Sequence, residues 1–242
     1  MRQSEPIFNV PGSVTALIGV CVLIHIVRAF LPMDLADWAT VALAFVPARY
    51  AGHAAEIAGG EVAAVTSFVT HMLVHGDVTH LMFNAMWFLA FGGAIAFRIG
   101  SPRFIAFTVF TGVAGALTFL AFHIGEPIPV VGASGAVSGM MGAVMRFIFV
   151  AMDRHDMPAL REAPRRIPLM SLRQTLSDKR IIAITAIWLL INLVSAVGMP
   201  GVSVGAGVAW EAHLGGFAAG LLFFGFFDHG KPPSTSRLRV VH

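Results

Sequence analysis

The chain has 242 residues, of which 57% are hydrophobic and 12% are charged, and its mean hydropathy is +0.79. Because these values lie well outside the usual composition of soluble globular domains, they predict a polytopic membrane protein. The formal net charge is +3, but no module of aromatic and basic residues accompanies it, so we expect no nucleic-acid partner.

Long apolar runs define the expected elements, because a helix of about 20 residues crosses a bilayer core about 30 Å thick. Six such runs follow one another, near residues 13–32, 72–97, 104–123, 134–151, 181–198 and 212–228. The first run lacks a clear small-residue cleavage site, so we interpret it as a retained helix and not as a signal peptide. The expected organisation is a segment 1–12, a six-helix domain 13–228 and a tail 229–242.

The basic residues predict how the helices are oriented, because Lys and Arg near span ends are retained on the cytoplasmic side. Most of them follow the second, fourth and sixth runs, whereas the segments 33–71, 124–133 and 199–211 contain only Arg49. We therefore expect both termini in the cytoplasm and these three segments outside. Arg146 lies near the inner end of the fourth run, and we expect its side chain to snorkel to the headgroups.

This topology places several polar residues at one depth. Ser134 begins the fourth run, His213 begins the sixth, and His80 and Asn84 lie in the outer half of the second. Singly, each has a structural interpretation, as a helix cap, a hydrogen-bonded interior histidine or a polar contact between helices. Together they favour a functional site, because polar groups at membrane depth are costly.

Small residues accompany both the serine and the histidine. His213 shares a helix face with Gly216 and Gly220, and Ser134 shares one with Gly142. Two such faces let helix backbones approach closely, which would bring the serine oxygen to the imidazole. Serine is a poor nucleophile unless a base takes its proton, and histidine, with an ordinary pKa near 6.5, is suited to that task.

Besides a nucleophile and a base, such a site can contain an orienting carboxylate and needs donors for the oxyanion. Glu211 is the nearest carboxylate to His213 in the sequence, but it lies on a different helix face, so we predict a dyad and no triad. Acyl transfer also needs donors aimed at the oxyanion. The candidates are the side chains of His80 and Asn84, at i and i+4 on one helix face, and the backbone N–H of Ser134.

Three other motif interpretations fail on the sequence. The segment GASGA at 132–136 lacks the second glycine of a hydrolase nucleophile elbow, and no strand pattern precedes it. In the histidine-rich segment 71–80, Met72 stands where a zinc protease needs its glutamate, so we predict no metal site and no cofactor. A transporter would show a pseudo-repeat between its two halves, and none is visible.

The segments that contain His80 and Asn84, Ser134, and His213 resemble motifs of the rhomboid family of intramembrane serine proteases. The matching segments, in a six-span frame over roughly residues 13–228, are HGDVTHLMFN at 75–84, GASG at 132–135, AHLGGFAAG at 212–220 and RIG at 98–100. The resemblance implies an all-α integral membrane protein, a six-transmembrane-helix rhomboid bundle with cytoplasmic N- and C-termini.

The resemblance also implies an activity, that of a serine endopeptidase that cleaves transmembrane substrates near the outer membrane face. Ser134 would attack the peptide bond, and His213 would act as base and then as acid. Asn84, His80 and the Ser134 N–H would hold the oxyanion. The fifth span would be a lateral gate, and the segment 199–211 would be a mobile cap over the site.

Two features depart from the family pattern. Ala96 stands where many rhomboids carry a glutamate two residues before Arg98, so that polar contact must be absent or replaced. The basic connection 152–180 is long for a bacterial six-span member. Topology retention explains its charge; the alternative is that anionic lipid headgroups bind three of its arginines, Arg161, Arg165 and Arg166.

A catalytically silent rhomboid-like protein that binds membrane clients is the alternative function. Such relatives usually lack the serine or the histidine, whereas this chain has both. We therefore expect an active protease with single-span transmembrane proteins and membrane lipid as partners. Because the start of the chain does not resemble a mitochondrial targeting sequence, the expected location is a bacterial plasma (inner) membrane.

Overall fold

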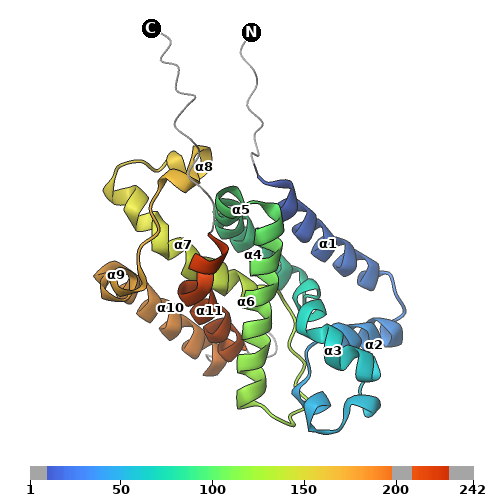
Figure 1. Ribbon diagram of the computed structural model, residues 1–242. Coiled ribbons are helices and arrows are strands. Elements are labelled where there is room, and N and C mark those ends of the chain that lie inside the picture. Colours follow the sequence, from blue (N-terminus) through green and yellow to red (C-terminus); the bar gives the residue numbers. More distant parts are fainter. Residues whose placement is uncertain (1–9, 198–208, 229–242) are drawn as a thin grey trace, which may run out of the picture.

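The computed structural model describes residues 10–197 and 209–228, and this part of the chain is an assembly of helices without a named strand (Figure 1). Its α-helices are α1 (Gly12–Ala29), α2 (Met33–Leu43), α3 (Gly60–Thr70), α4 (Val78–Trp87), α5 (Gly93–Ile99), α6 (Ser101–Phe122), α7 (Ser134–Asp153), α8 (Ala159–Glu162), α9 (Leu172–Ser177), α10 (Lys179–Val197) and α11 (Trp210–Phe227). A π-helical segment, Phe88–Gly92, joins α4 to α5 into one long helix. The all-α prediction is confirmed.

The six predicted spans are present as helices that are long and apolar enough to cross a membrane. They are α1, the continuous helix Val78–Ile99, α6, α7, α10 and α11. The second span begins later than the predicted residue 72. Residues His71–Leu73 form a separate 3-10 turn, and Asp77 caps α4 by accepting a 2.8 Å hydrogen bond from the His80 N–H.

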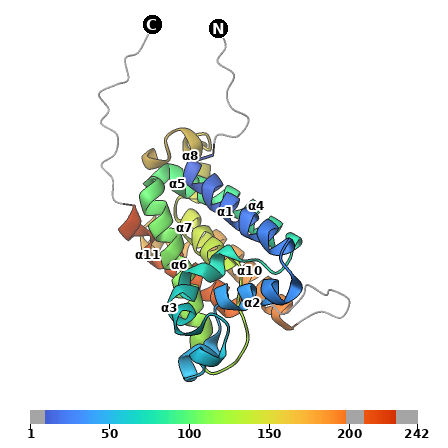
Figure 2. The same cartoon turned by 90° about the vertical axis from the view of Figure 1, so that its right-hand side faces the viewer.

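The helix α7 is the central span (Figures 1 and 2). Of its most apolar stretch 78% is buried inside the protein, compared with 44% for α6 and α11 and 11% for α1 and α10. Its sequence explains this position, because glycines and alanines line its N-terminal half and let neighbouring backbones approach closely. Ser134, in the first turn of α7, therefore lies on the helix that the other spans surround.

Glycines make the contact between α7 and α11 close. A Cβ atom added to Gly216 or Gly220 of α11 would overlap the backbone carbonyl of Gly135 or Gly139 of α7. At Gly142 an added Cβ would lie 2.6 Å from the Phe217 carbonyl oxygen. The two helices therefore pack backbone against backbone, as the spacing of small residues predicts.

The segment between α1 and the second span supports the end of the bundle at which α7 begins. It contains α2, α3 and three 3-10 turns, Pro47–Ala51, Ala54–Glu56 and His71–Leu73. Phe45 exchanges two backbone hydrogen bonds, of 3.0 and 2.8 Å, with Val130 in the loop that leads into α7. Arg49, only 3% exposed, donates to three backbone carbonyls, those of Val41, Ala44 and Ala58. The loop before Ser134 is thereby fixed to a folded platform.

Ala96 offers Arg98 no polar partner, and the carboxylate that pairs with Arg98 comes from a residue far along the chain. Arg98, 4% exposed, forms two hydrogen bonds of 2.9 and 2.8 Å with the carboxylate of Asp228, just after α11. Its third nitrogen donates to the carbonyls of Pro164 and Ile167. The bidentate pair joins the second span to the end of the sixth, and the buried charge is neutralised.

The prediction that Arg146 snorkels to the headgroups is wrong. Its side chain is 5% exposed and donates to the backbone carbonyls of Met170 and Leu221. The reason is that the connection 152–180 folds back as α8, a 3-10 turn and α9, and supplies the Met170 carbonyl near the C-terminal end of α7. In the same connection, Arg165 donates to the Arg98 carbonyl at 2.7 Å. Binding of lipid by this connection stays a prediction.

Candidate active site

Ser134 is the first residue of α7, and a strained glycine leads into it. Gly132 has φ +110°, and its N–H donates to the His71 carbonyl at 2.9 Å. A Cβ atom at Gly132 would also lie 2.6 Å from Nε2 of His80. Only glycine satisfies both the positive φ and the lack of space, so the approach of the loop to α4 depends on it.

His213 lies in the first turn of α11, next to the start of α7. Its Nε2 atom is 2.7 Å from Oγ of Ser134, which is hydrogen-bond distance. The carbonyl group of Ala212 rests against the glycines of both neighbouring helices, since a Cβ at Gly115 or Gly135 would lie 2.6 or 3.4 Å from its oxygen. The glycine faces thus bring together the two side chains that the sequence pairs.

Asn192 is a third member of this cluster that the sequence analysis did not single out. It lies on α10, is 8% exposed, and its Oδ1 atom is 2.6 Å from Nδ1 of His213. The group that contacts Nδ1 of His213 is therefore not a carboxylate close in sequence but an amide from another span. A signal was available, because Asn192 is a polar side chain inside an apolar run, just as Asn84 is.

His80 and Asn84 face the loop that leads into Ser134. The amide nitrogen of Asn84 donates to the His80 carbonyl at 2.9 Å, and the Oδ1 atom of Asn84 is buried without a hydrogen-bond partner. Measured from the position that a Gly132 Cβ would occupy, Nε2 of His80 is 2.6 Å away and Nδ2 of Asn84 is 3.8 Å away. Both side chains are therefore near the residue that the loop presents, and their role as oxyanion donors stays a prediction.

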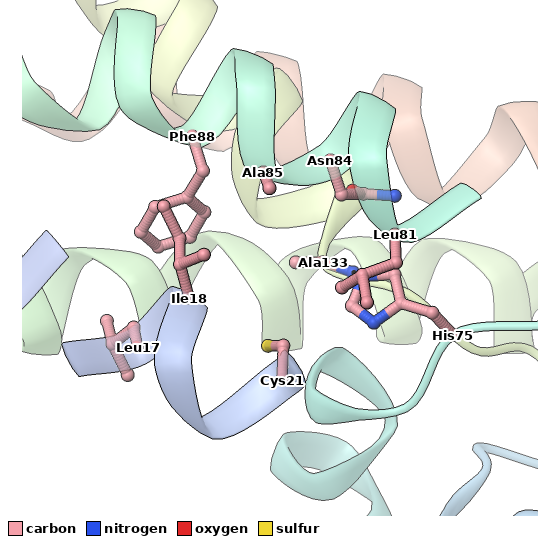
Figure 3. Close-up of a pocket in the computed structure, with 9 residues that line it drawn as sticks. All are labelled: Leu17, Ile18, Cys21, His75, Leu81, Asn84, Ala85, Phe88 and Ala133. Carbon is pink, nitrogen blue, oxygen red and sulfur yellow. Dashed lines mark hydrogen bonds between the residues drawn. The ribbon is translucent and has the colours of Figure 1, made fainter. Parts of the chain in front are cut away.

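Below this loop a small apolar cavity opens between α1 and α4 (Figure 3). In Figure 3 the two helices contribute from opposite sides, with Ala133 between them. Its lining is apolar except for the side chains of His75 and Asn84. Burial, together with the nearby charges of His80, His25 and Arg28, lowers the pKa of His75 to about 4. A neutral ring can accept the weak 3.5 Å hydrogen bond that the Ala133 N–H donates to its Nε2 atom.

Metal-binding geometry is missing from the part of the chain that is described. In residues 10–197 and 209–228 no group of three or more His, Cys, Asp or Glu side chains could hold a metal ion. The rings of His75 and His80 are 5.2 Å apart and meet edge to face.

The predicted cap at 199–211 falls, apart from its last three residues, outside the described residues.

The cluster is thus a serine hydroxyl, an imidazole and a carboxamide connected by hydrogen bonds across three spans, beside a glycine loop with two further donors. Residues 62–229 match the family model of the Rhomboid domain. The chain belongs to the rhomboid family. With its six apolar helices, this rhomboid is a multi-pass integral membrane protein.

Individual relatives carry the names of rhomboid proteases. The chain is 24% identical to "Rhomboid protease GlpG" of Klebsiella pneumoniae over 166 residues, 68% of this chain and 49% of the relative. It is 28% identical over 111 residues to "Putative rhomboid protease YdcA" of Bacillus subtilis, which is 45% of this chain and 53% of the relative. It is 32% identical over 89 residues to "Rhomboid protease GluP" of the same species, which is 37% of this chain and 16% of the relative. The chain thus spans about half or less of the length of these relatives.

Proposed function

We propose that this rhomboid is an intramembrane serine endopeptidase in which Ser134 is the nucleophile and His213 is the general base. The observation that carries the proposal is the 2.7 Å distance between Oγ of Ser134 and Nε2 of His213. The two residues lie 79 positions apart in the sequence and come from different spans. A serine hydroxyl directed at an imidazole is the arrangement that nucleophilic catalysis of acyl transfer requires.

The proposed reaction has two halves. Oγ of Ser134 attacks the carbonyl carbon of the scissile bond while its proton passes to Nε2 of His213. The tetrahedral intermediate collapses as the imidazolium returns this proton to the leaving amine, which leaves an ester on the serine. A water molecule then attacks the ester, His213 takes and returns its proton, and the carboxylic acid and the free serine are released.

The negative charge of the tetrahedral intermediate would be held at the start of α7. The N–H of Ser134 belongs to the first turn of that helix, where amides have no partner within the helix and the helix dipole favours an anion. His80 and Asn84 are the side-chain donors beside the same loop. Asn84 would exchange its bond to the His80 carbonyl for a bond to the oxyanion, which develops only during the reaction.

The proposed substrates are single-span transmembrane proteins, cleaved near the outer face of a bacterial inner membrane. Ser134 and His213 both lie at the first turns of their spans, so the reaction takes place near one end of the bundle. A peptide bond inside a helix is shielded by the surrounding turns, so the substrate has to unwind locally before the serine can reach it. The names of the relatives, which are all those of rhomboid proteases, agree with this proposal.

The test uses the full chain in lipid vesicles with a single-span substrate. Ser134→Ala should lower cleavage by at least about 10³-fold, because nothing replaces the nucleophile. Ser138→Ala is the matched control: its hydroxyl, one turn further along α7, donates to the Ser134 carbonyl within the helix, so most activity should remain. Equal activity of Ser134→Ala and the unmodified chain would refute the proposal.

A fluorophosphonate probe separates the protease from a silent client-binding protein. The probe should label the unmodified chain and the Ser138→Ala variant, but not Ser134→Ala or His213→Ala, because labelling needs an activated serine. A folded chain that holds a transmembrane client but takes no label would support the silent alternative instead.

A further inference from the structure

We propose that Asn192 of α10 is a positioning residue for the base, so that the dyad works as a Ser134–His213–Asn192 triad. This inference rests on the proposed function and adds to it a residue from the fifth span. The group that orients the base would then be a neutral carboxamide, delivered by a helix that is otherwise weakly attached to the bundle.

Burial separates Asn192 from the rest of its helix. Only 11% of the most apolar stretch of α10 is buried, and the neighbours Ile191 and Leu193 are 59% and 49% exposed. Asn192 is 8% exposed and turned toward α11. A lone amide directed inward from a lipid-facing helix needs a partner, because an unpaired polar group at this depth is costly.

The hydrogen bonds of Asn192 fix the orientation of its amide group. The Nδ2 atom is 2.8 Å from the Trp188 carbonyl oxygen, which can only accept, so the amide nitrogen must point there. The Oδ1 atom therefore points at Nδ1 of His213, 2.6 Å away. An amide oxygen can only accept, so Nδ1 must carry the proton of the neutral imidazole.

This assignment determines the direction of the bond to the serine. If Nδ1 carries the proton, Nε2 has a free lone pair, and the hydroxyl of Ser134 donates to it across 2.7 Å. With the opposite tautomer, Nε2 would donate to Oγ and could not take the serine proton. Asn192 therefore holds His213 in the tautomer and the ring orientation that a general base needs.

A carboxamide fits this place better than a carboxylate does. In the resting protein the imidazole is neutral, so a carboxylate at position 192 would be an unpaired charge close to lipid. The amide accepts the same hydrogen bond without that desolvation cost. It stabilises the imidazolium less strongly than a charge would, because it contributes only a dipole.

The packing of α10 connects this bond to the position of the helix. At the inner end, Arg180 pairs with Asp153 of α7, and in the middle Trp188 stacks on Phe217 of α11 with ring centroids 4.8 Å apart. Beyond Trp188 most side chains face outward, and Val194 is 39% exposed. A shift of this outer half away from α11 would remove the acceptor from His213.

The experiment compares Asn192→Leu with Asn192→Asp in the full chain, with kcat and KM measured across pH. Asn192→Leu keeps the branched shape of the side chain but removes the acceptor, so kcat should fall about tenfold or more, with KM changing less than twofold. Asn192→Asp restores an acceptor and should recover part of that kcat at neutral pH. Its negative charge stabilises the imidazolium, so the acidic limb of the kcat/KM profile should move to higher pH. A residue that only supports folding would not move that limb.

Ser195→Ala is the matched control, because Ser195 lies one turn further along α10 and donates only to the Ile191 carbonyl of its own helix. It should behave as the unmodified chain does. Unchanged kcat in Asn192→Leu, or an unshifted acidic limb in Asn192→Asp, would overturn the inference; if Asn192→Leu does not fold, the aspartate variant decides. An inactive unmodified chain, or an active Ser134→Ala variant, would instead refute the proposed function.

Discussion

Two of the helices that contact α11 near His213, α7 and α10, do so in opposite ways. On one side, α7 meets α11 through glycines, and the carbonyls of one backbone lie where a Cβ of the other would be. On the other side, α10 meets α11 mainly through large side chains, with Trp188 stacked on Phe217 and most of its surface exposed. The first contact has no freedom to slide; the second can open without disturbing backbone packing.

This difference divides the candidate active site into a fixed part and an adjustable part. Ser134 and His213 belong to α7 and α11, so the distance between the proposed nucleophile and the proposed base is set by the rigid contact. Asn192 belongs to α10, so the orientation of the base depends on the looser one. Changes at the first interface should therefore abolish the site, whereas changes at the second should weaken it.

The largest effect is expected from Gly220→Ala, which breaks the rigid contact. The added Cβ would overlap the Gly139 carbonyl, and backbone cannot move aside as a flexible side chain can. We expect a loss of about 3 kcal/mol or more in stability, at the upper end of overpacking effects, and cleavage at least about 100-fold lower. Thermal unfolding in detergent and cleavage in vesicles measure the two quantities.

Gly225→Ala is the control for this change, because it adds the same methyl group five residues further along α11. There the nearest atom to the new Cβ would be a flexible Arg146 nitrogen at 3.7 Å. Stability should change by less than about 1 kcal/mol, since alanine favours the helix over glycine. Equal effects of the two substitutions would show that helix propensity matters more here than the close approach of α7.

A smaller effect is expected from Trp188→Ala, which loosens the adjustable contact. Removing the indole deletes the stack on Phe217, and we expect a loss of about 1 kcal/mol, the range of such aromatic pairs beyond their buried area. Amide hydrogen exchange should accelerate in residues 189–197 of α10, while that of α7 stays unchanged. Because Asn192 would then leave His213 more often, kcat should fall several-fold.

The matched control is Trp87→Ala. Trp87 also stacks on an aromatic ring, but on Phe91 of its own span, with centroids 5.2 Å apart. This substitution should leave hydrogen exchange of α10 unaltered. If Trp188→Ala accelerated exchange in α7 as much as in α10, the two interfaces would form one cooperative unit and the distinction between them would not hold.

The rigid part of the molecule could be predicted from the sequence, because its signals are local. Apolar runs give the six spans, and the small residues beside Ser134 and His213 recur at helical spacing and give the faces that meet. The family model matches the same region, residues 62–229. No distance was needed to choose these two residues.

The adjustable part could not be predicted, because the partner of a side chain depends on how whole helices are placed. The fifth span is apolar all round, so periodicity does not tell which face looks inward, and Asn192 could have faced any neighbour. The prediction for Arg146 failed for the same reason, and the sequence did not name the partner of Arg98. Their acceptors come from the connection 152–180 and from Asp228, far away in the sequence.

The smallest effect concerns the N-terminal end of α11, where Glu211 contacts a titratable side chain just after α6. His123 lies just after α6 and contacts two glutamates. Its Nδ1 atom is 2.9 Å from Oε2 of Glu126, and its Nε2 atom is 3.0 Å from Oε1 of Glu211 in α11. Burial opposes the charged ring, but the hydrogen bonds and charges of the two glutamates outweigh it and raise the pKa of His123 above 6.5. A raised pKa stabilises the folded state below about pH 6.5, and this contribution is lost as the pH rises through the folded value.

We therefore expect the stability difference between the unmodified chain and His123→Gln to be at most about 1 kcal/mol at pH 6 and to shrink toward pH 8.5, because the contact is partly exposed and screened. Thermal unfolding at several pH values measures this difference. His53→Gln is the matched control, since His53 pairs only with Glu56, three residues away on an exposed segment. A difference that grew with pH would have the wrong sign for a charged His123. A difference that did not change with pH would mean that the charge of His123 contributes nothing to holding this end of α11.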